Sequence, residues 1–325
     1  MQRFLGVLSA SVLLACAAFG PTAANAEWPE RPLRLIVPFQ PGSSSDVIAR
    51  IVAGQLGPRL STQVVVENRV GGSTIVGTEM IARAAPDGYT IGLANTSSHA
   101  ASRALAEKLP FDPIKDFIPV AMIGSSPFLF LGSKSVPASN LRELIDYAKK
   151  NPGKMNYASA GPATLSHLAG ELIKKLAGIE ITHVPYRGTA QSVMDLLEGR
   201  MELLVGVINS THEFARNGQI TAFATLDTKR TPVLPDVPTI AEAGLPGAEA
   251  SLWSAIVLPA GTPAPIVQKL YRELSFVLQA PELQASLRKQ GIEPQPGSPE
   301  VVAAQIQADV KKWSDLIVSA KIGKN

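Results

Sequence analysis

The chain has 325 residues, of which 46% are hydrophobic and 18% charged, and its formal net charge is +3 at pH 7. Its lysines and arginines form no cluster, so no nucleic-acid-binding surface is expected. Cys16 is the single cysteine, which excludes a disulfide or a multi-thiolate metal site within the chain. The composition is that of a globular protein with a sizeable hydrophobic core.

Residues 1–26 have the features of a secretory signal peptide. A short charged start precedes an apolar run from Phe4 to Cys16, and Ala24-Asn25-Ala26 forms a small-residue cleavage site. The run is shorter than the ~20 residues that a membrane span needs. We therefore expect export, cleavage before Glu27 and a periplasmic location. The alternative is a lipoprotein anchored at Cys16, which the bulky Leu14 disfavours.

The predicted mature chain is long enough for two domains. Removal of 26 residues from 325 leaves 299, more than one hydrophobic core usually serves. Strand and helix patterns alternate in the first part and restart after Ser125. The expected strands are 33–37, 64–66, 89–94, 128–131, 155–158, 181–184, 203–207, 220–224 and 251–258, with helices at 46–56, 74–85, 140–150, 165–176 and 189–197 and a mainly helical C-terminal part. This order predicts an α/β fold with mostly parallel sheets flanked by helices.

The sequence gives little support for catalysis. The four histidines, His99, His167, His183 and His212, lack the spacing of a zinc site, and the chain carries no nucleophile elbow, phosphate loop or dinucleotide fingerprint. Ser166 and His167 are adjacent, so on a helix their side chains point roughly 100° apart, a poor geometry for a nucleophile and its base. We expect no metal, no cofactor and no enzyme activity.

Two loops of small residues each join a strand to a helix. They are "FQPGSSSD", Phe39 to Asp46, and "ASAGPATLSH", Ala158 to His167. In open α/β sheets ligands bind beyond the strand ends, and the start of a helix offers unpaired N–H groups that favour an anion. Ordinary helix capping by serine and aspartate explains each loop alone about equally well. One such loop in each half of the chain favours binding of a carboxylate.

Several stretches in chain order also carry a family resemblance. They include "RPLRLIVPFQPGSSSDVIAR", "VVVENRVGG", "ARAAPDGYTIGLANTS", "LPFDPIKDFIPVA", "NPGKMNYASAGPATLSHLAGELIKKLAG", "HVPYRGTAQSVMDLLEGR" and "KRTPVLPDVPTIAEAGLPG". Together they resemble the substrate-binding proteins of tripartite tricarboxylate transporters, the Bug family. The resemblance covers nearly the whole predicted mature chain.

This resemblance implies a periplasmic-binding-protein-like, type II-like Venus flytrap of two α/β domains. Domain 1 would comprise residues 27–124 and a return segment with C-terminal helices, 245–325, and domain 2 residues 125–244. A monomer would close on a small organic carboxylate and deliver it to a tripartite tricarboxylate transporter permease in the membrane. The resemblance implies the following ligand-binding residues: Phe39, Gln40, Pro41, Gly42, Ser43, Ser44, Ser45, Asp46, Asn95, Thr96, Ser97, Ser159, Ala160, Gly161, Thr164, His167, Arg187, Gly206 and Asn209.

The chain departs from the family pattern at four positions. Ser43 replaces a glycine in the first loop, and Ala160 and Pro162 remove a hydroxyl and an N–H donor from the second. Gly206 stands where an acidic residue is common, which removes a counter-charge for an ammonium group. We therefore expect an uncharged-tail or aromatic carboxylate, filling the space left by Gly206, and not an amino acid.

Two other functions stay open at this point. A secreted hydrolase could use a serine of either loop, although the sequence shows no base or oxyanion hole near them. A ligand-sensing protein could present its closed form to a membrane sensor and not to a permease. Arg187 could pair with a ligand carboxylate or be an ordinary exposed arginine, and Phe39 is the best aromatic candidate beside the first loop.

Overall fold

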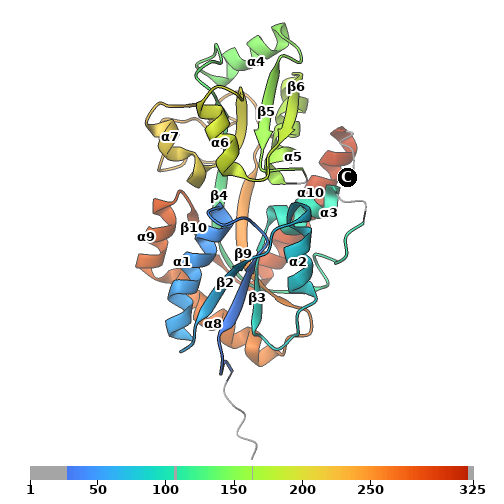
Figure 1. Ribbon diagram of the computed structural model, residues 1–325, viewed down its shortest axis with the longest axis vertical. Coiled ribbons are helices and arrows are strands. Elements are labelled where there is room, and N and C mark those ends of the chain that lie inside the picture. Colours follow the sequence, from blue (N-terminus) through green and yellow to red (C-terminus); the bar gives the residue numbers. More distant parts are fainter. Residues whose placement is uncertain (1–27, 106–107, 163, 321–325) are drawn as a thin grey trace, which may run out of the picture.

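The computed structural model describes residues 28–105, 108–162 and 164–320. The expected signal peptide, its cleavage site and Cys16 lie outside these ranges. Two lobes lie one above the other, and the long strands β4 (Phe117–Gly132) and β9 (Ser251–Pro259) connect them (Figure 1). Within the described residues, no helix combines the length and the apolar character needed to cross a bilayer.

The first lobe, the lower one in Figure 1, is built on a parallel sheet in which β1 lies between β2 and β3. Its elements are β1 (Leu33–Val37), α1 (Ser44–Arg59), β2 (Val64–Asn68), η1 (Gly72–Thr74), α2 (Ile75–Ala82), β3 (Thr90–Asn95), η2 (Ser97–Ala101), α3 (Ser102–Leu105), α8 (Ala264–Gln279), α9 (Pro281–Lys289) and β10 (Glu293–Gly297). Successive side chains of a strand point to opposite faces. Leu33, Leu35 and Val37 accordingly pack with α1, α8 and α9, whereas Ile36 packs in a second cluster with α2. Helices thus cover both faces of this sheet.

The second lobe repeats the arrangement, with β5 parallel to both β6 and β7. Its elements are α4 (Leu141–Lys150), β5 (Met155–Ser159), α5 (Leu165–Ala177), β6 (Ile181–Pro185), α6 (Thr189–Leu197), β7 (Leu203–Val207), η3 (Ile208–Ser210), α7 (His212–Arg216) and β8 (Thr221–Thr225). Phe128 and Phe130 of β4 pack in one cluster with α4 and α5, while Leu129 and Leu131 pack in another with α6. The predicted α/β architecture is confirmed.

Strand β4 passes through both lobes. Its first part pairs antiparallel with β9 and β10, and its last part pairs antiparallel with β7 and β8. The sequence predicted only residues 128–131 of this strand, because Pro119, Gly124 and Pro127 indicate turns. The structure accommodates the first two of these near register shifts in the pairing with β9, where ladder hydrogen bonding is relaxed. Strand β10, "EPQPG", was missed for the same reason.

Helix α10 (Pro299–Ala320) also contributes to both lobes. Val302 and Ile306 join a core cluster of the first lobe, and Trp313 and Ile317 join the largest cluster of the second. The Trp253 indole N–H donates to the Asp309 carboxylate at 2.6 Å, which ties β9 to α10 between the lobes. The expected domain limits near residues 125 and 245 stay a prediction.

Candidate functional site

A cavity of about 430 Å³ lies between the two lobes. The residues that line it come from loops of both lobes and from three strand positions: Pro38, Phe39, Gln40, Ser43, Ser44, Ser45, Val70, Gly71, Gly72, Ser73, Thr74, Ser97, Phe128, Ala160, Gly161, Pro162, Thr164, Ser166, Tyr186, Arg187, Gly188, Thr189, Val207 and Leu252. These loops follow the carboxyl ends of β1, β2, β3, β5 and β6. Such strand ends are where open α/β sheets bind ligands.

The first loop presents the start of α1 to this cavity. Ser43 is the N-cap, and its hydroxyl accepts the Asp46 N–H at 3.3 Å. The N–H groups of Ser44 and Ser45 precede the first intrahelical bond, so helix geometry gives them no acceptor within α1. Both residues are buried and line the cavity. The α1 terminus therefore offers two backbone donors and a partial positive charge to an anion.

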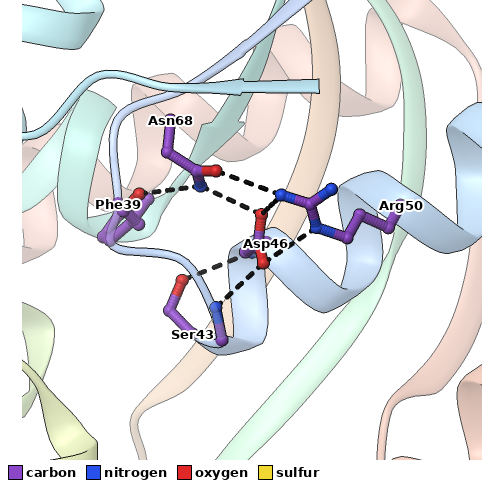
Figure 2. A network of polar contacts seen from close by, with 6 residues as sticks. Phe39, Ser43, Asp46, Arg50 and Asn68 are labelled. Carbon is purple, nitrogen blue, oxygen red and sulfur yellow. Dashed lines mark hydrogen bonds and ion pairs between the residues drawn. The ribbon is translucent and has the colours of Figure 1, made fainter. Parts of the chain in front are cut away.

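Asp46 does not line the cavity, contrary to expectation, but holds the first loop in shape (Figure 2). One carboxylate oxygen accepts the Gly42 N–H at 2.9 Å, and the other accepts the Asn68 amide at 2.9 Å. Arg50 forms an ion pair with Asp46 at 3.0 Å, and Asn68 also donates to the Phe39 carbonyl. Burial opposes ionisation, yet the hydrogen bonds from Arg50, Gly42 and Asn68 outweigh it and lower the pKa of Asp46.

Pro41 and Gly42 also lie outside the cavity lining, on the exposed turn before α1. Gly42 has φ +78°, a backbone conformation that side chains rarely adopt, and a Cβ there would meet no atom within 4 Å. The glycine is therefore needed for the turn, whereas the space for a ligand is provided by the serines that follow it.

Asn95 and Thr96 are fully buried behind the first loop and do not reach the cavity lining. The Asn95 amide donates to Ser45 Oγ at 3.0 Å, so the Ser45 hydroxyl proton is directed elsewhere. Thr96 donates to the Ser251 carbonyl of β9. Both residues were expected to contact a ligand; Asn95 instead supports Ser45, which lines the cavity, and Thr96 bonds to β9.

Three backbone donors of the second loop bond to serine hydroxyls, two within the loop and one in the other lobe. The Ala160 N–H donates to Ser166 Oγ at 3.0 Å, and the Gly161 N–H donates to Ser159 Oγ at 3.1 Å. The Leu165 N–H, in the first turn of α5, donates across the lobes to Ser97 Oγ at 3.1 Å. Ala160, Gly161, Thr164 and Ser97 line the cavity, but the donors expected to capture a carboxylate here already have acceptors.

Ser159 and His167 belong to the second loop but do not line the cavity. Ser159 Oγ is 2.7 Å from His183 Nε2, and the His167 and His183 rings stack with centroids 4.1 Å apart. Burial, together with the charge of His167, lowers the pKa of His183 to about 4, and burial lowers the pKa of His167. Both imidazoles are therefore neutral near pH 7, and His183 supports the loop through its contact with Ser159.

Gly206 and Asn209 are the last predicted site residues outside the cavity lining. A Cβ on Gly206 would meet Thr211 Cγ2 at 2.9 Å and the Leu204 side chain at 3.2 Å. The missing side chain of Gly206 thus makes room for its own lobe, and the expectation that it leaves space for a ligand was wrong. Asn209 lies in η3, where its side-chain oxygen accepts the Ser210 hydroxyl.

The start of α6 supplies the polar side of the cavity from the second lobe. Gly188 is its N-cap, without a side-chain capping bond among the described residues, and Thr189 is the first helical residue. Arg187, directly before them, lines the cavity as well. A Cβ on Gly188 would lie 3.1 Å from Gln40 Oε1 of the first lobe, so the two lobes approach each other closely here. The family resemblance likewise implies that the stretch from Tyr186 to Thr189 is part of the site wall, and all four residues line the cavity.

Besides single residues such as Pro38 and Ser166, two parts of the lining were not in the predicted set. The loop from Val70 to Thr74 follows β2, and its paired glycines, Gly71 and Gly72, are explained equally well by a simple turn. The apolar floor is formed by Phe128, Val207 and Leu252, each from a strand that also contributes to a core. An apolar strand residue gives no sequence signal that separates a cavity floor from an ordinary core position.

The fold and this cavity define a two-lobed binding protein, and comparison with known proteins gives its family. Residues 48–322 match the family described as "Tripartite tricarboxylate transporter family receptor". The chain belongs to this family. It is similar to the protein BugT of Bordetella pertussis, with 32% identity over 318 residues that cover 98% of this chain and 97% of BugT.

Solved structures of two similar proteins have the same fold. Rpa4515 of R. palustris, solved with adipate, is 34% identical with a TM-score of 0.87, covering 91% of this chain and 99% of that chain. The periplasmic binding protein BugD is 34% identical with a TM-score of 0.86, covering 92% of this chain and all of that one (100%). The family and these neighbours are binding proteins and not enzymes.

Proposed function

We propose that this chain is a periplasmic receptor that captures a small organic carboxylate between its lobes and delivers it to a tripartite tricarboxylate transporter permease. The observation that carries the proposal is the convergence of the α1 and α6 starts on one cavity of about 430 Å³. Each helix start contributes unpaired N–H groups and roughly half a positive charge. The volume is within the range of small-molecule sites.

The charges around the cavity favour an anion over a zwitterion. Arg187 is the one charged side chain among the described lining residues, and none of those residues is acidic. An ammonium group would find no counter-charge there, and burying it unpaired is unfavourable. The absence of a side chain at Gly206 was the first reason to exclude amino acids, but Gly206 lies outside the cavity lining. The absence of acidic residues from the described lining still leads us to expect a ligand that is not an amino acid.

The apolar floor defines the rest of the ligand. Phe128, Val207 and Leu252 present hydrocarbon surface between the polar loops of the two lobes. A ligand with one carboxylate at the α1 start and an aliphatic or aromatic body would bury its apolar surface there. Adipate, the ligand in the structure of Rpa4515, has a carboxylate at each end of an aliphatic chain of this kind.

Two contacts across the cavity support capture by closure of the lobes. The Leu165 N–H bonds to Ser97 Oγ, and Gln40 approaches Gly188. Both contacts join residues of different lobes, so any separation of the lobes breaks them. A ligand held from both sides would favour the closed form, and that form is the one we expect a monomer to present to the permease.

The serines of the cavity are better suited to binding than to nucleophilic attack. None of the described lining residues is a histidine, and Ser166 Oγ already accepts the Ala160 N–H. His167 stacks on His183. A serine nucleophile needs a general base within hydrogen-bond reach, and we therefore infer that the chain is not an enzyme.

The test is a binding screen on protein without residues 1–26, unfolded and refolded to remove any carried-over ligand. Thermal shifts would be measured with adipate, malate, citrate, benzoate, aspartate and glutamate. A ligand at 100 times its Kd adds about 2.7 kcal/mol of stability, which raises Tm by a few degrees. We expect a shift with at least one non-amino acid and recovery of that acid unchanged. Tighter binding of aspartate or glutamate would contradict the assigned ligand class.

A further inference from the structure

The loop after β2 has an unusual backbone where it borders the cavity. Four consecutive residues have positive φ: Gly71 at 147°, Gly72 at 51°, Ser73 at 52° and Thr74 at 89°. Glycine adopts such values freely, but a β-branched threonine does so rarely and at an energetic cost. Strained residues of this kind persist where the surrounding structure imposes them, and they concentrate at functional sites.

Packing around Gly77 and Thr78 holds this loop in place. A Cβ on Gly77 would lie 2.3 Å from the Arg69 carbonyl oxygen and 2.8 Å from Pro38 Cα, so α2 packs directly against both strand ends. The Thr78 hydroxyl donates to the Thr74 carbonyl at 2.8 Å. These contacts fix the loop beside Pro38, the residue that precedes the first loop.

The Thr74 side chain is buried against the cavity without a bonding partner. It is 5% exposed, lines the cavity, and its hydroxyl has no hydrogen-bond partner among the described residues. The Ser44 hydroxyl, at the start of α1, shares all three properties. A buried hydroxyl without a partner is unfavourable for folding, so two of them on one cavity wall indicate a role outside folding.

We propose that Thr74 is a ligand-binding residue, whose hydroxyl donates a hydrogen bond to a carboxylate oxygen held at the start of α1. The carboxylate head group then lies in the first lobe, between the Ser44 and Ser45 N–H groups and Thr74, and its body extends over the apolar floor. Thr74 borders the cavity beside the start of α1, with its hydroxyl buried. This inference rests on the proposed carboxylate receptor and specifies which lobe binds the head group.

Substitution at Thr74 tests this assignment, with the tightest-binding acid of adipate, malate, citrate and benzoate as the probe. Thr74→Val keeps the β-branched shape and the backbone strain but removes the hydroxyl. We expect its Kd, measured by titration calorimetry, to rise about tenfold, the usual effect of losing a hydrogen bond to a charged group. Its Tm without ligand should stay equal or rise, because an unpartnered hydroxyl is replaced by a methyl group. Thr74→Ser should keep Kd within about threefold of the wild type.

Thr225→Val is the matched control. The Thr225 hydroxyl of β8 is also buried and without a partner among the described residues, but it lies outside the cavity lining. Its removal should leave Kd unchanged. A Thr74→Val Kd within about threefold of the wild type, or a lowered Tm in that variant, would overturn the role of Thr74 but not the carboxylate receptor. Failure of the wild type to bind any of the acids would overturn the carboxylate receptor as well.

Discussion

The two small-residue loops of the cavity look alike in sequence and differ in what they offer a ligand. Each joins the end of a parallel strand to a helix, and each is rich in serine, glycine and alanine. In the first loop, Ser44 and Ser45 line the cavity, and their N–H groups precede the first bond of α1. In the second, the Ala160, Gly161 and Leu165 N–H groups donate to serine hydroxyls.

The difference comes from what caps each helix. In the first loop the Ser43 hydroxyl accepts the third N–H group of α1, and Asp46 turns away to bond with Gly42, so the first two N–H groups stay available. In the second loop the Thr164 hydroxyl donates to the Gly161 carbonyl, and a serine of the other lobe accepts from α5. The first loop thus leaves the Ser44 and Ser45 N–H groups without an acceptor in α1, whereas the second loop bonds to Ser97 of the other lobe.

The largest effect is expected from a negative charge in the first loop. Ser44→Asp places a carboxylate in the first turn of α1, where the helix dipole favours it, but in the position assigned to the ligand. Affinity for the bound acid should fall more than about 100-fold, because like charges brought together cost several kcal/mol. Tm should not fall.

The matched control makes the same change at the first residue of another helix. Ala264→Asp in α8 lies outside the cavity lining and should leave affinity unchanged. Equal loss of affinity in the two variants, measured by calorimetry, would show that the first loop has no special part in binding.

A smaller effect is expected from the network that shapes the first loop. Asp46→Asn removes the charge that bonds with Gly42, Arg50 and Asn68. Hydrogen bonds to charged groups contribute roughly 1.5–3 kcal/mol, so the free energy of unfolding in urea should fall by about 2 kcal/mol. Asp315→Asn, at an exposed pair on α10, should change it by less than about 0.5 kcal/mol. Equal changes in both variants would exclude a shaping role for Asp46.

The hydrogen bond between the lobes, from Leu165 to Ser97, should have a smaller effect, seen in ligand affinity. Ser97→Ala removes the acceptor of the Leu165 N–H and with it one bond of the closed form. A net loss of about 1 kcal/mol corresponds to an affinity about fivefold weaker. Ser102→Ala removes a bond to the Ser98 carbonyl within one lobe and should reduce stability without changing affinity. If both variants bind the ligand as the wild type does, the Ser97 bond has no part in closure.

Lowering the pH should affect His183, which contacts the second loop, before it affects Asp46 in the first loop. His183 has a pKa of about 4, lowered first by burial, and the fully buried His99 has a pKa of about 3. The unfolded chain binds these protons below about pH 6.5, so stability falls as pH drops from 6.5 towards 4. Asp46 has a lowered pKa and loses its contribution only at more acid pH.

The variant His183→Gln checks this explanation. Glutamine can still bond with Ser159 but does not titrate, so the slope of unfolding free energy against pH should flatten between pH 6.5 and 4 and stay unchanged above pH 7. A slope identical to that of the wild type would mean that His183 is not neutral in the folded protein.

The sequence predicted the local elements of the fold better than the roles of individual site residues. Periodicity located β1, α6 and β7 at their observed bounds, because each has a regular apolar pattern ended by turn residues. It placed the first loop at the cavity, since a strand end leading into a helix start is a local feature. It could not show that Asp46 and Asn95 point away from the cavity, because neighbouring side chains decide their direction.

Long-range contacts account for most of what was missed. Only the fold brings Ser97 to the start of α5, separated from it by 68 positions, and only the fold shows that Gly206 accommodates Thr211. The close packing of α2 on Pro38 and Arg69, next to Thr74, is likewise visible only in the fold. None of these contacts has a signature in a single stretch of sequence.

A crystal structure of the complex with the tightest-binding acid tests most directly whether the first loop, and not the second, binds the carboxylate. We predict a carboxylate oxygen within about 3 Å of the Ser44 or Ser45 backbone nitrogen, with the Ser97 bond to Leu165 intact. A carboxylate bonded to the Ala160 or Gly161 nitrogen, with none at the start of α1, would contradict the account.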